Sequence, residues 1–317
     1  MKDIFNRRLL ITMGKGGVGR SLVTAALVQC ALKRGMKVLC VQMTSEDRLS
    51  PLLGCQKATS EVVETLPGLF MVNIQAMDAL KEYAVMQVRL EFIYRLVFEN
   101  RAVKYFIRAV PALKDLVVLG KILFHEKETD AAGKPLYDII IVDAPPTGHG
   151  IFLLNIPSVM LSAVHSGPIN REVRDMYKVL TDPTLTAVNF VSLPEEMPAS
   201  ETMGLYKKLL EEYHIPPGVL FINAVFPPMF NPREQDVVEN LVAGKLRGDW
   251  RLRCLLKCAH MSIARHRLNR HYVELLRKKL PLDCIELPYV FADEMDSAVT
   301  GMLAEIMETE FAASGRT

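Results

Sequence analysis

The chain has 317 residues, half of them hydrophobic, and its 38 Lys and Arg residues nearly balance its 36 Asp and Glu residues. Balanced charge without a basic block argues against a general nucleic-acid-binding protein. No apolar run approaches the roughly 20 residues of a membrane span, which argues against direct membrane insertion. Six scattered cysteines and a polar start without a signal-peptide pattern predict a reduced, cytoplasmic protein.

The first predicted elements are a strand, a glycine-rich loop, a helix and a second strand. Residues 8–12 are predicted as the strand, residues 21–34 as a helix that Gly35 ends, and residues 37–41 as a buried strand. This order is typical of a parallel sheet covered by helices on both faces.

Later segments continue the alternation of strands and helices. Further strands are predicted at residues 69–75, 137–143, 187–193, 219–223 and 284–287. Helices are predicted at residues 77–127, 199–213, 234–243, 262–279 and 293–310. The sequence therefore predicts one doubly wound, mostly parallel α/β domain over residues 1–317, with a helical insertion at residues 77–127.

The loop after the first strand has the composition of a phosphate cradle. Its glycines let successive backbone N–H groups converge on anionic oxygens, and the following helix directs its positive end at them. Ser21 stands where a hydroxyl ligates Mg²⁺, and Arg20 keeps a positive charge where the usual loop has lysine. The sequence predicts a P-loop NTPase that binds ATP and Mg²⁺ through Gly14, Lys15, Gly16, Gly17, Val18, Gly19, Arg20, Ser21 and Leu22.

Residues 14–21 resemble the deviant Walker A motif. That motif is shared by partition ATPases, septum-site ATPases, nitrogenase-iron-type proteins, and the ArsA-type arsenite-pump and tail-anchored-protein-targeting ATPases. The resemblance implies that Lys15 reaches across a dimer to the partner's nucleotide. ATP binding and dimer closure would then be coupled.

A second motif favours the ArsA-type branch. Residues 143–150 read DAPPTGHG and resemble the switch II motif of that branch. An acid at the end of a strand, here Asp143, is placed to hold the Mg²⁺ shell, usually through water. The Pro-Thr-Gly-His run after it is expected to be a mobile segment that senses the γ-phosphate.

Three further segments extend the resemblance over nearly the whole chain. Residues 193–202 resemble the family's LPEEMP-x-x-ET segment. Residues 221–223 resemble its strand end, where the resemblance implies that the amide of Asn223 reads the adenine. Pro288 and Tyr289 match the last strand and loop, which pack against the base. The chain is therefore identified as a divergent, bacterial-like relative of the ArsA-type ATPases.

Switch I departs from the family pattern. The family aspartate that orients the attacking water is replaced by Thr44, which cannot accept a proton usefully at neutral pH. Glu46 or Asp47 could substitute if the loop is shifted, but a solvated turn is the favoured interpretation of both. Together with Arg20, Thr44 predicts ATP binding with slow hydrolysis. No cysteine lies between Cys55 and Cys254, so arsenite stimulation is not expected.

Two cysteines near the C-terminal part resemble, at a different spacing, the zinc-binding pair at the dimer interface of eukaryotic targeting ATPases. Cys254 and Cys258 are four residues apart, with His260 close by, ahead of a basic helix. A metal shared with a partner chain and plain helix cysteines both remain open, and plain cysteines are favoured.

The insertion carries apolar stripes at helical spacing, such as Met86, Leu90, Ile93 and Val97. In the targeting branch the corresponding helices form a groove for a client's hydrophobic helix. Packing against the sheet is the favoured alternative, because such stripes usually face inward.

Two functional hypotheses follow. In the first, a homodimeric ATPase uses Lys15, Arg20, Thr44 and Asp143 in catalysis, with Ser21 and Asp143 serving Mg²⁺, and dimer closure acts on a client or partner protein. In the second, the chain is a weak or inactive subunit of a heterodimer with an active paralogue. A septum-site type is disfavoured, because the segment from Asp293 onward is acidic rather than basic.

Overall fold

The computed structural model describes residues 4–44, 46–80, 82, 111–244 and 250–314. Within them, eight strands form one sheet in the order β3-β4-β2-β5-β1-β6-β7-β8. Only β3 and β4 pair antiparallel, and every other neighbouring pair is parallel. The strands are β1 (Leu9–Gly14), β2 (Val38–Gln42), β3 (Val63–Leu66), β4 (Leu69–Asn73), β5 (Ile139–Asp143), β6 (Thr186–Ser192), β7 (Pro217–Val225) and β8 (Cys284–Pro288).

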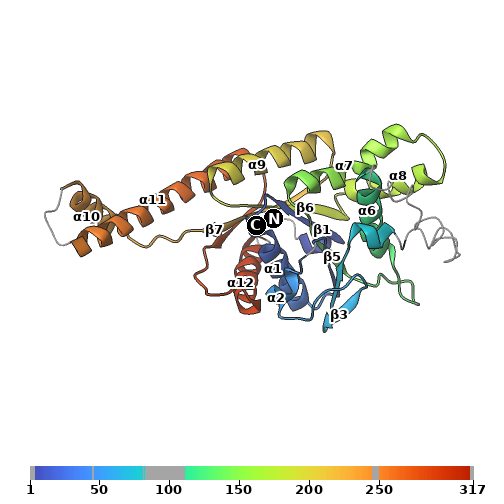
Figure 1. Ribbon diagram of the computed structural model, residues 1–317, viewed down its shortest axis with the longest axis horizontal. Helices are drawn as coiled ribbons and strands as arrows, with labels where there is room; N and C mark the ends of the chain where they lie inside the picture. Colours follow the sequence, from blue (N-terminus) through green and yellow to red (C-terminus); the bar gives the residue numbers. More distant parts are fainter. Residues whose placement is uncertain (1–3, 45, 81, 83–110, 245–249, 315–317) are drawn as a thin grey trace.

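Helices cover both faces of this sheet (Figure 1). One face packs against α1 (Arg20–Lys33), α2 (Leu49–Leu53) and α12 (Ser297–Ser314). The opposite face packs against α6 (Pro111–Lys127), α7 (Thr147–Ala163), α9 (Glu196–Lys207) and part of α11 (Trp250–Lys279). Alongside α6 and α7 lies α8 (Pro168–Thr181), and α10 (Pro232–Ala243) packs on α11.

The central strands explain why the sequence reads as continuous apolar runs. Every residue of β1, β2, β5 and β6 is buried. Successive side chains alternate between the two faces, so Leu10 packs toward α1 while Ile11 packs toward α7 and α9. Burial on both faces is the expected environment of parallel strands, and the predicted doubly wound fold is confirmed.

The helices differ from the predicted ones in several places. The short helix α2 was not predicted, and neither were α7 and α8; α7 begins inside a Pro- and Gly-containing motif and contains Pro157. The predicted helix at residues 262–279 begins twelve residues earlier, at Trp250, in a stretch where nearly every side chain is exposed, so no buried face marks its start. Of the predicted insertion, residues 83–110 lie outside the described residues, and residues 111–127 form α6.

Within the described part of the chain, no helix has both the length and the apolar character that a bilayer crossing requires. All six cysteines are free thiols.

Candidate nucleotide site

The carboxyl ends of three parallel strands meet beside the glycine-rich loop. In register, Thr12 of β1 lies beside Asp143 of β5, and Asp143 lies beside Gln42 of β2. Partners in register point to the same face of a sheet, here the face that α1 covers. The loop of residues 15–19 leaves β1 at this edge and enters α1 directly.

Gly17 and Gly19 both have φ in the left-handed region, and Gly14 and Gly19 approach neighbouring strands closely. Gly19 has a φ of 86°, in the left-handed region, and a Cβ there would lie 2.2 Å from the amide nitrogen of Asn223. A Cβ on Gly14 would lie 2.4 Å from the carbonyl oxygen of Val191 in β6. Both positions are closed to any side chain, so β6 and β7 fix the path of the loop.

Asn223 supports the loop from β7. Its side-chain amide donates a hydrogen bond of 2.9 Å to the carbonyl oxygen of Val18, and the residue is buried. The structure therefore gives Asn223 a structural contact that its sequence position did not indicate. The adenine-reading role expected from the resemblance stays a prediction.

Ser21 and Asp143 form the polar centre of the site. The Ser21 hydroxyl donates a hydrogen bond of 2.6 Å to Oδ2 of Asp143. The other carboxylate oxygen of Asp143 is buried and has no partner among the described residues. Burial raises the pKa of Asp143, while the hydrogen bond from Ser21 and the charge of Arg20 oppose the rise.

Two further buried oxygens beside Asp143 are also without a protein partner in the described part of the chain. They are Oγ1 of Thr12 and Oε1 of Gln42, which flank Asp143 in the sheet. Buried oxygens are usually hydrogen-bonded, so these oxygens are available to accept from water or to face a cation's hydration shell. Oxygen donors around a carboxylate fit a hydrated Mg²⁺ ion, because Mg²⁺ takes oxygen ligands and keeps several waters.

Arg20 spans the gap between α1 and switch II. Its guanidinium donates a hydrogen bond to the carbonyl oxygen of Ala144, the residue after Asp143. Burial lowers the pKa of Arg20, and the charge of Asp143 counteracts this effect. Arg20, which was predicted to neutralise phosphate charge, therefore contacts the switch II segment, which was predicted to sense the γ-phosphate.

Lys15 is paired within its own chain. Its ammonium lies 2.7 Å from Oε1 of Glu201, which belongs to α9 and to the LPEEMP-x-x-ET segment. Both side chains are partly exposed. The sequence showed these two residues in separate motifs and did not connect them. The expected contact of Lys15 with a partner's nucleotide stays a prediction.

Both carboxylates of the predicted switch I segment have partners in the chain. Partial burial acts to raise the pKa of Asp47, but hydrogen bonds from Ser50, Gln42 and Ala58 outweigh it and lower that pKa. Asp47 therefore serves its own loop, and Glu46 is exposed beside Arg48. The Thr44 hydroxyl donates to the carbonyl oxygen of Glu46.

The predicted base-contacting segment lies in an aromatic cluster. Tyr289, which follows Pro288 at the end of β8, packs against Phe226 and Phe291 at centroid distances of 5.7 and 4.8 Å. The guanidinium of Arg265 lies 5.2 Å from the Phe226 ring and 5.6 Å from the Tyr289 ring. Phe226, Phe291 and Arg265 were not predicted as neighbours of Tyr289, because Phe226 and Arg265 lie far from it in the chain and no motif marks Phe291. Leu22, in the first turn of α1, is partly buried and packs against the core.

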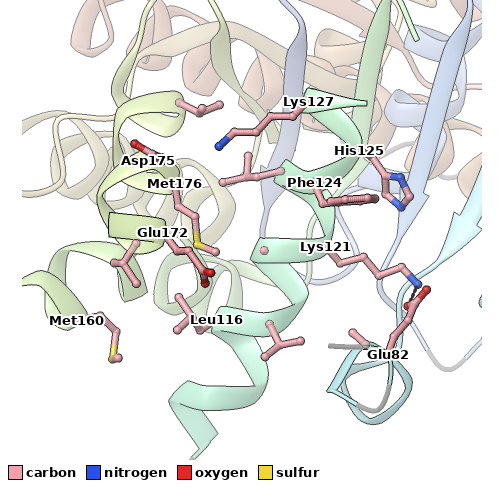
Figure 2. A pocket seen from close by; sticks show the side chains of 16 residues that line it. Glu82, Leu116, Lys121, Phe124, His125, Lys127, Met160, Glu172, Asp175 and Met176 are labelled. Carbon is pink, nitrogen blue, oxygen red and sulfur yellow. Dashed lines mark hydrogen bonds and ion pairs between the residues drawn. The ribbon is translucent and has the colours of Figure 1, made fainter. Parts of the chain in front are cut away.

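A second candidate site is an apolar cavity of about 460 Å³ between α6 and α8 (Figure 2). Apolar side chains make most of its wall, and Lys121, Lys127 and Glu172 stand among them. The wall includes Leu116, Leu123, Met160, Val173, Met176 and Val179. The same helix α6 packs Leu119 and Ile122 into the core. The described end of the predicted insertion therefore contributes both to the core and to a cavity.

One side-chain contact joins the switch II segment to the helix that lines this cavity. Nε2 of His149, in the first turn of α7 and within the switch II motif, lies 3.2 Å from Oδ1 of Asp115 in α6. Asp115 precedes Leu116 in the cavity wall and is largely buried. Burial raises the pKa of Asp115, and the nearby His149 opposes the rise.

Cys254 and Cys258 are exposed thiols on α11. His260 lies two residues beyond Cys258 and so on a different side of the helix. Among the described residues, no group of three or more His, Cys, Asp or Glu side chains is arranged to hold a metal ion. Metal sharing with a partner chain stays a prediction.

Together, the parallel sheet, the glycine loop entering α1 and the buried Ser21–Asp143 pair define a nucleotide-binding P-loop ATPase. The chain belongs to the anion-transporting ATPase family, whose model matches residues 7–171 and 168–237. The resemblance to ArsA-type ATPases is therefore confirmed.

Curated relatives agree with this assignment. The chain is 29% identical over 232 residues to the ATPase BagA of Mycobacterium tuberculosis, covering 72% of this chain and 68% of the relative. It is 24% identical to the arsenical pump-driving ATPase of Acidiphilium multivorum, covering 74% of this chain and 44% of that protein. It is 22% identical to the ATPase ASNA1 homolog of Entamoeba dispar, covering 68% of this chain and 75% of that protein.

Proposed function

We propose that this protein binds MgATP at the edge formed by β1, β5 and β2 and hydrolyses it slowly. The observation that carries the proposal is the buried Ser21–Asp143 pair with unpartnered oxygens of Asp143, Thr12 and Gln42 around it. A magnesium ion bound there would neutralise phosphate charge. The backbone N–H groups of residues 16–21 would bind the phosphates, and Ser21 and Asp143 would hold the ion's shell.

Arg20 and Lys15 carry the remaining positive charge. Each must leave a protein partner to reach phosphate, Arg20 the carbonyl of Ala144 and Lys15 the carboxylate of Glu201. Arrival of the nucleotide would therefore release the start of switch II and free Lys15 for a partner subunit. This exchange of contacts supports coupling between ATP binding and closure of a dimer in the cytoplasm.

A subunit of a heterodimer is the alternative function, and switch I favours it. Thr44 replaces the family carboxylate, and the nearby Asp47 accepts hydrogen bonds from Gln42, Ser50 and Ala58. With no free carboxylate at that position, the attacking water is expected to lack a base or orienting acid. An active paralogue would then supply turnover.

The output of the cycle is handling of an apolar client or partner segment at the cavity between α6 and α8. The support is the apolar wall of that cavity and the His149–Asp115 pair that connects it to switch II. An apolar cavity of this size is suited to apolar side chains of a partner.

The deciding experiment measures MgATP binding by calorimetry and turnover by phosphate release, on the purified chain alone and on Lys15→Ala and Asp143→Ala. Turnover that both substitutions abolish supports a self-sufficient homodimer. Binding without turnover supports the heterodimer subunit, and adding the paralogue should then restore phosphate release. Absence of ATP binding by the correctly folded parent chain would refute the proposal.

A further inference from the structure

The distal half of α11 exposes an apolar stripe that nothing in the described chain covers. Trp250, Cys254, Cys258 and Met261 follow one another at steps of four, four and three residues, so they share one side of the helix. Trp250 is 63% exposed and Met261 is 61% exposed, and both thiols are exposed. These four residues are called the outer stripe below.

The opposite side of the same helix is already used. Leu256 and Ile263 are its buried residues, and each lies two positions from a member of the outer stripe, hence across the helix. Here α11 packs on α10, with Arg267 paired to Glu239. Figure 1 shows α10 and the start of α11 standing away from the sheet. The outer stripe therefore faces away from the fold that it belongs to.

Cations border the outer stripe on both sides. At about 100° per residue, Arg251 lies at one edge, with its guanidinium 5.8 Å from the centre of the Trp250 ring, and Arg253 and Lys257 lie at the other. Residues 250–273 contain six Lys or Arg residues and no Asp or Glu, namely Arg251, Arg253, Lys257, Arg265, Arg267 and Arg270. The partner that matches this surface must be apolar at its centre and anionic at its rim.

These features distinguish between three kinds of partner: a second copy of this chain, another protein and a lipid surface. In a two-fold contact between copies of this chain, identical cationic edges would face one another and repel. A specific protein partner would use about one hydrogen bond per 100–200 Å², yet the outer stripe presents an indole, two thiols and a thioether. An anionic lipid surface does not require specific contacts at fixed positions, and it accommodates both the apolar centre and the cationic edges. The charged ends of Arg and Lys reach the lipid headgroups, while their aliphatic stems and the indole stay in the interface.

We propose that the distal half of α11 binds the surface of anionic membranes, with the outer stripe in the headgroup boundary and Arg251, Arg253 and Lys257 on the lipid phosphates. The helix lies on the bilayer and does not cross it. Each cation near such a surface strengthens binding several-fold. The inference does not rest on the proposed nucleotide binding, since the residues of α11 that pack against the core under the sheet, Tyr272, Val273 and Leu276, lie in the other half of the helix.

Trp250 makes the proposal directly measurable, because it is the only tryptophan of the chain. The full-length protein is mixed with vesicles of phosphatidylcholine, alone or with about one third phosphatidylglycerol. With anionic vesicles, Trp250 emission should shift to shorter wavelength, acrylamide quenching should fall, and the protein should co-sediment. Zwitterionic vesicles should leave all three unchanged, and about 0.5 M salt should reverse the effect.

A pair of matched charge reversals tests the placement. Arg253→Glu with Lys257→Glu should weaken partition to anionic vesicles at least about tenfold. Lys278→Glu with Lys279→Glu makes the same charge change at exposed positions at the other end of α11 and should stay within about twofold of the parent. Circular dichroism and thermal melts establish that both variants fold.

Three results would overturn the proposal. The first is that Trp250 emission in the parent does not respond to anionic vesicles. The second is that both double variants lose binding equally, which assigns the attraction to overall charge. The third is that Trp250 becomes protected as protein concentration rises without lipid, with a dimer in ultracentrifugation, which assigns the outer stripe to a second copy.

Discussion

Asp143 is held in an environment that disfavours its charge. The side chain is buried beside unpartnered oxygens, and burial raises its pKa despite Ser21 and Arg20. A buried carboxylate binds a cation strongly, because the cation supplies the stabilisation of the negative charge that water would otherwise provide. Without nucleotide and metal, the buried charge destabilises the folded protein.

Asp143→Asn should therefore separate stability from activity. A raised native pKa means that the folded state binds more protons, so the free energy of unfolding of the parent should fall as pH rises from the ordinary value of 3.8 to the raised pKa. The variant should lack this fall, and its MgATP turnover should drop at least about 100-fold. Denaturant unfolding across about pH 4–8 without nucleotide checks the first result. Parallel curves for both proteins would contradict it.

Two glycines of the phosphate loop should respond differently to alanine. Gly19→Ala introduces a Cβ at positive φ, 2.2 Å from the Asn223 amide, and should lower the free energy of unfolding by about 1–3 kcal/mol. Gly16→Ala meets nothing within 4 Å and should leave stability within about 0.5 kcal/mol. Both should weaken ATP binding, because a methyl group obstructs the phosphates. Equal melting temperatures for the two variants would argue against a loop fixed by β7.

At the level of elements, α7 connects the nucleotide edge to the cavity. Its first turn carries His149, which pairs with Asp115 of α6, while α6 and α8 form the cavity wall. Movement of switch II can thus change the cavity without any contact between nucleotide and α6. This contact arises because residues 115 and 149 meet only after the sheet has brought α6 beside α7.

Asp115→Asn should reduce that communication. In the parent, binding of an apolar fluorescent dye to the cavity should change when MgATP is added. In the variant this change should fall to about half or less, while turnover and folding persist, since a neutral amide still fits a site where burial raises the acid's pKa. Asp175→Asn, on the α8 side of the same cavity, is the control and should respond as the parent does. An unchanged dye response in Asp115→Asn would exclude this route.

At the scale of the whole molecule, the Lys15–Glu201 pair opposes association in the proposed dimer. Partly exposed ion pairs contribute about 0–1 kcal/mol, so the opposition is modest. Glu201→Gln should tighten MgATP-dependent dimerisation by no more than about fivefold, measured by analytical ultracentrifugation. Glu196→Gln, at the exposed start of α9, should have no effect. Weaker dimerisation of Glu201→Gln would indicate that the partner requires Glu201 itself.

The sequence alone determined the local features of this protein. Apolar runs ending in glycine or acid predicted the parallel strands, because burial on both faces leaves no other composition. Residues 14–21 and 143–150 predicted the phosphate loop and its acid, since backbone convergence on phosphate requires glycine and a cation requires oxygen. Family membership followed from the order of these motifs, and the family match confirmed it.

Only the tertiary structure decided which distant residues meet. It placed Glu201 on Lys15, Asn223 under Gly19, and His149 against Asp115. Among the described residues, nothing covers one side of the distal half of α11. Helical periodicity in a sequence shows that a face is apolar, but not what covers it, because contact partners are set by the packing of elements that lie far apart along the chain.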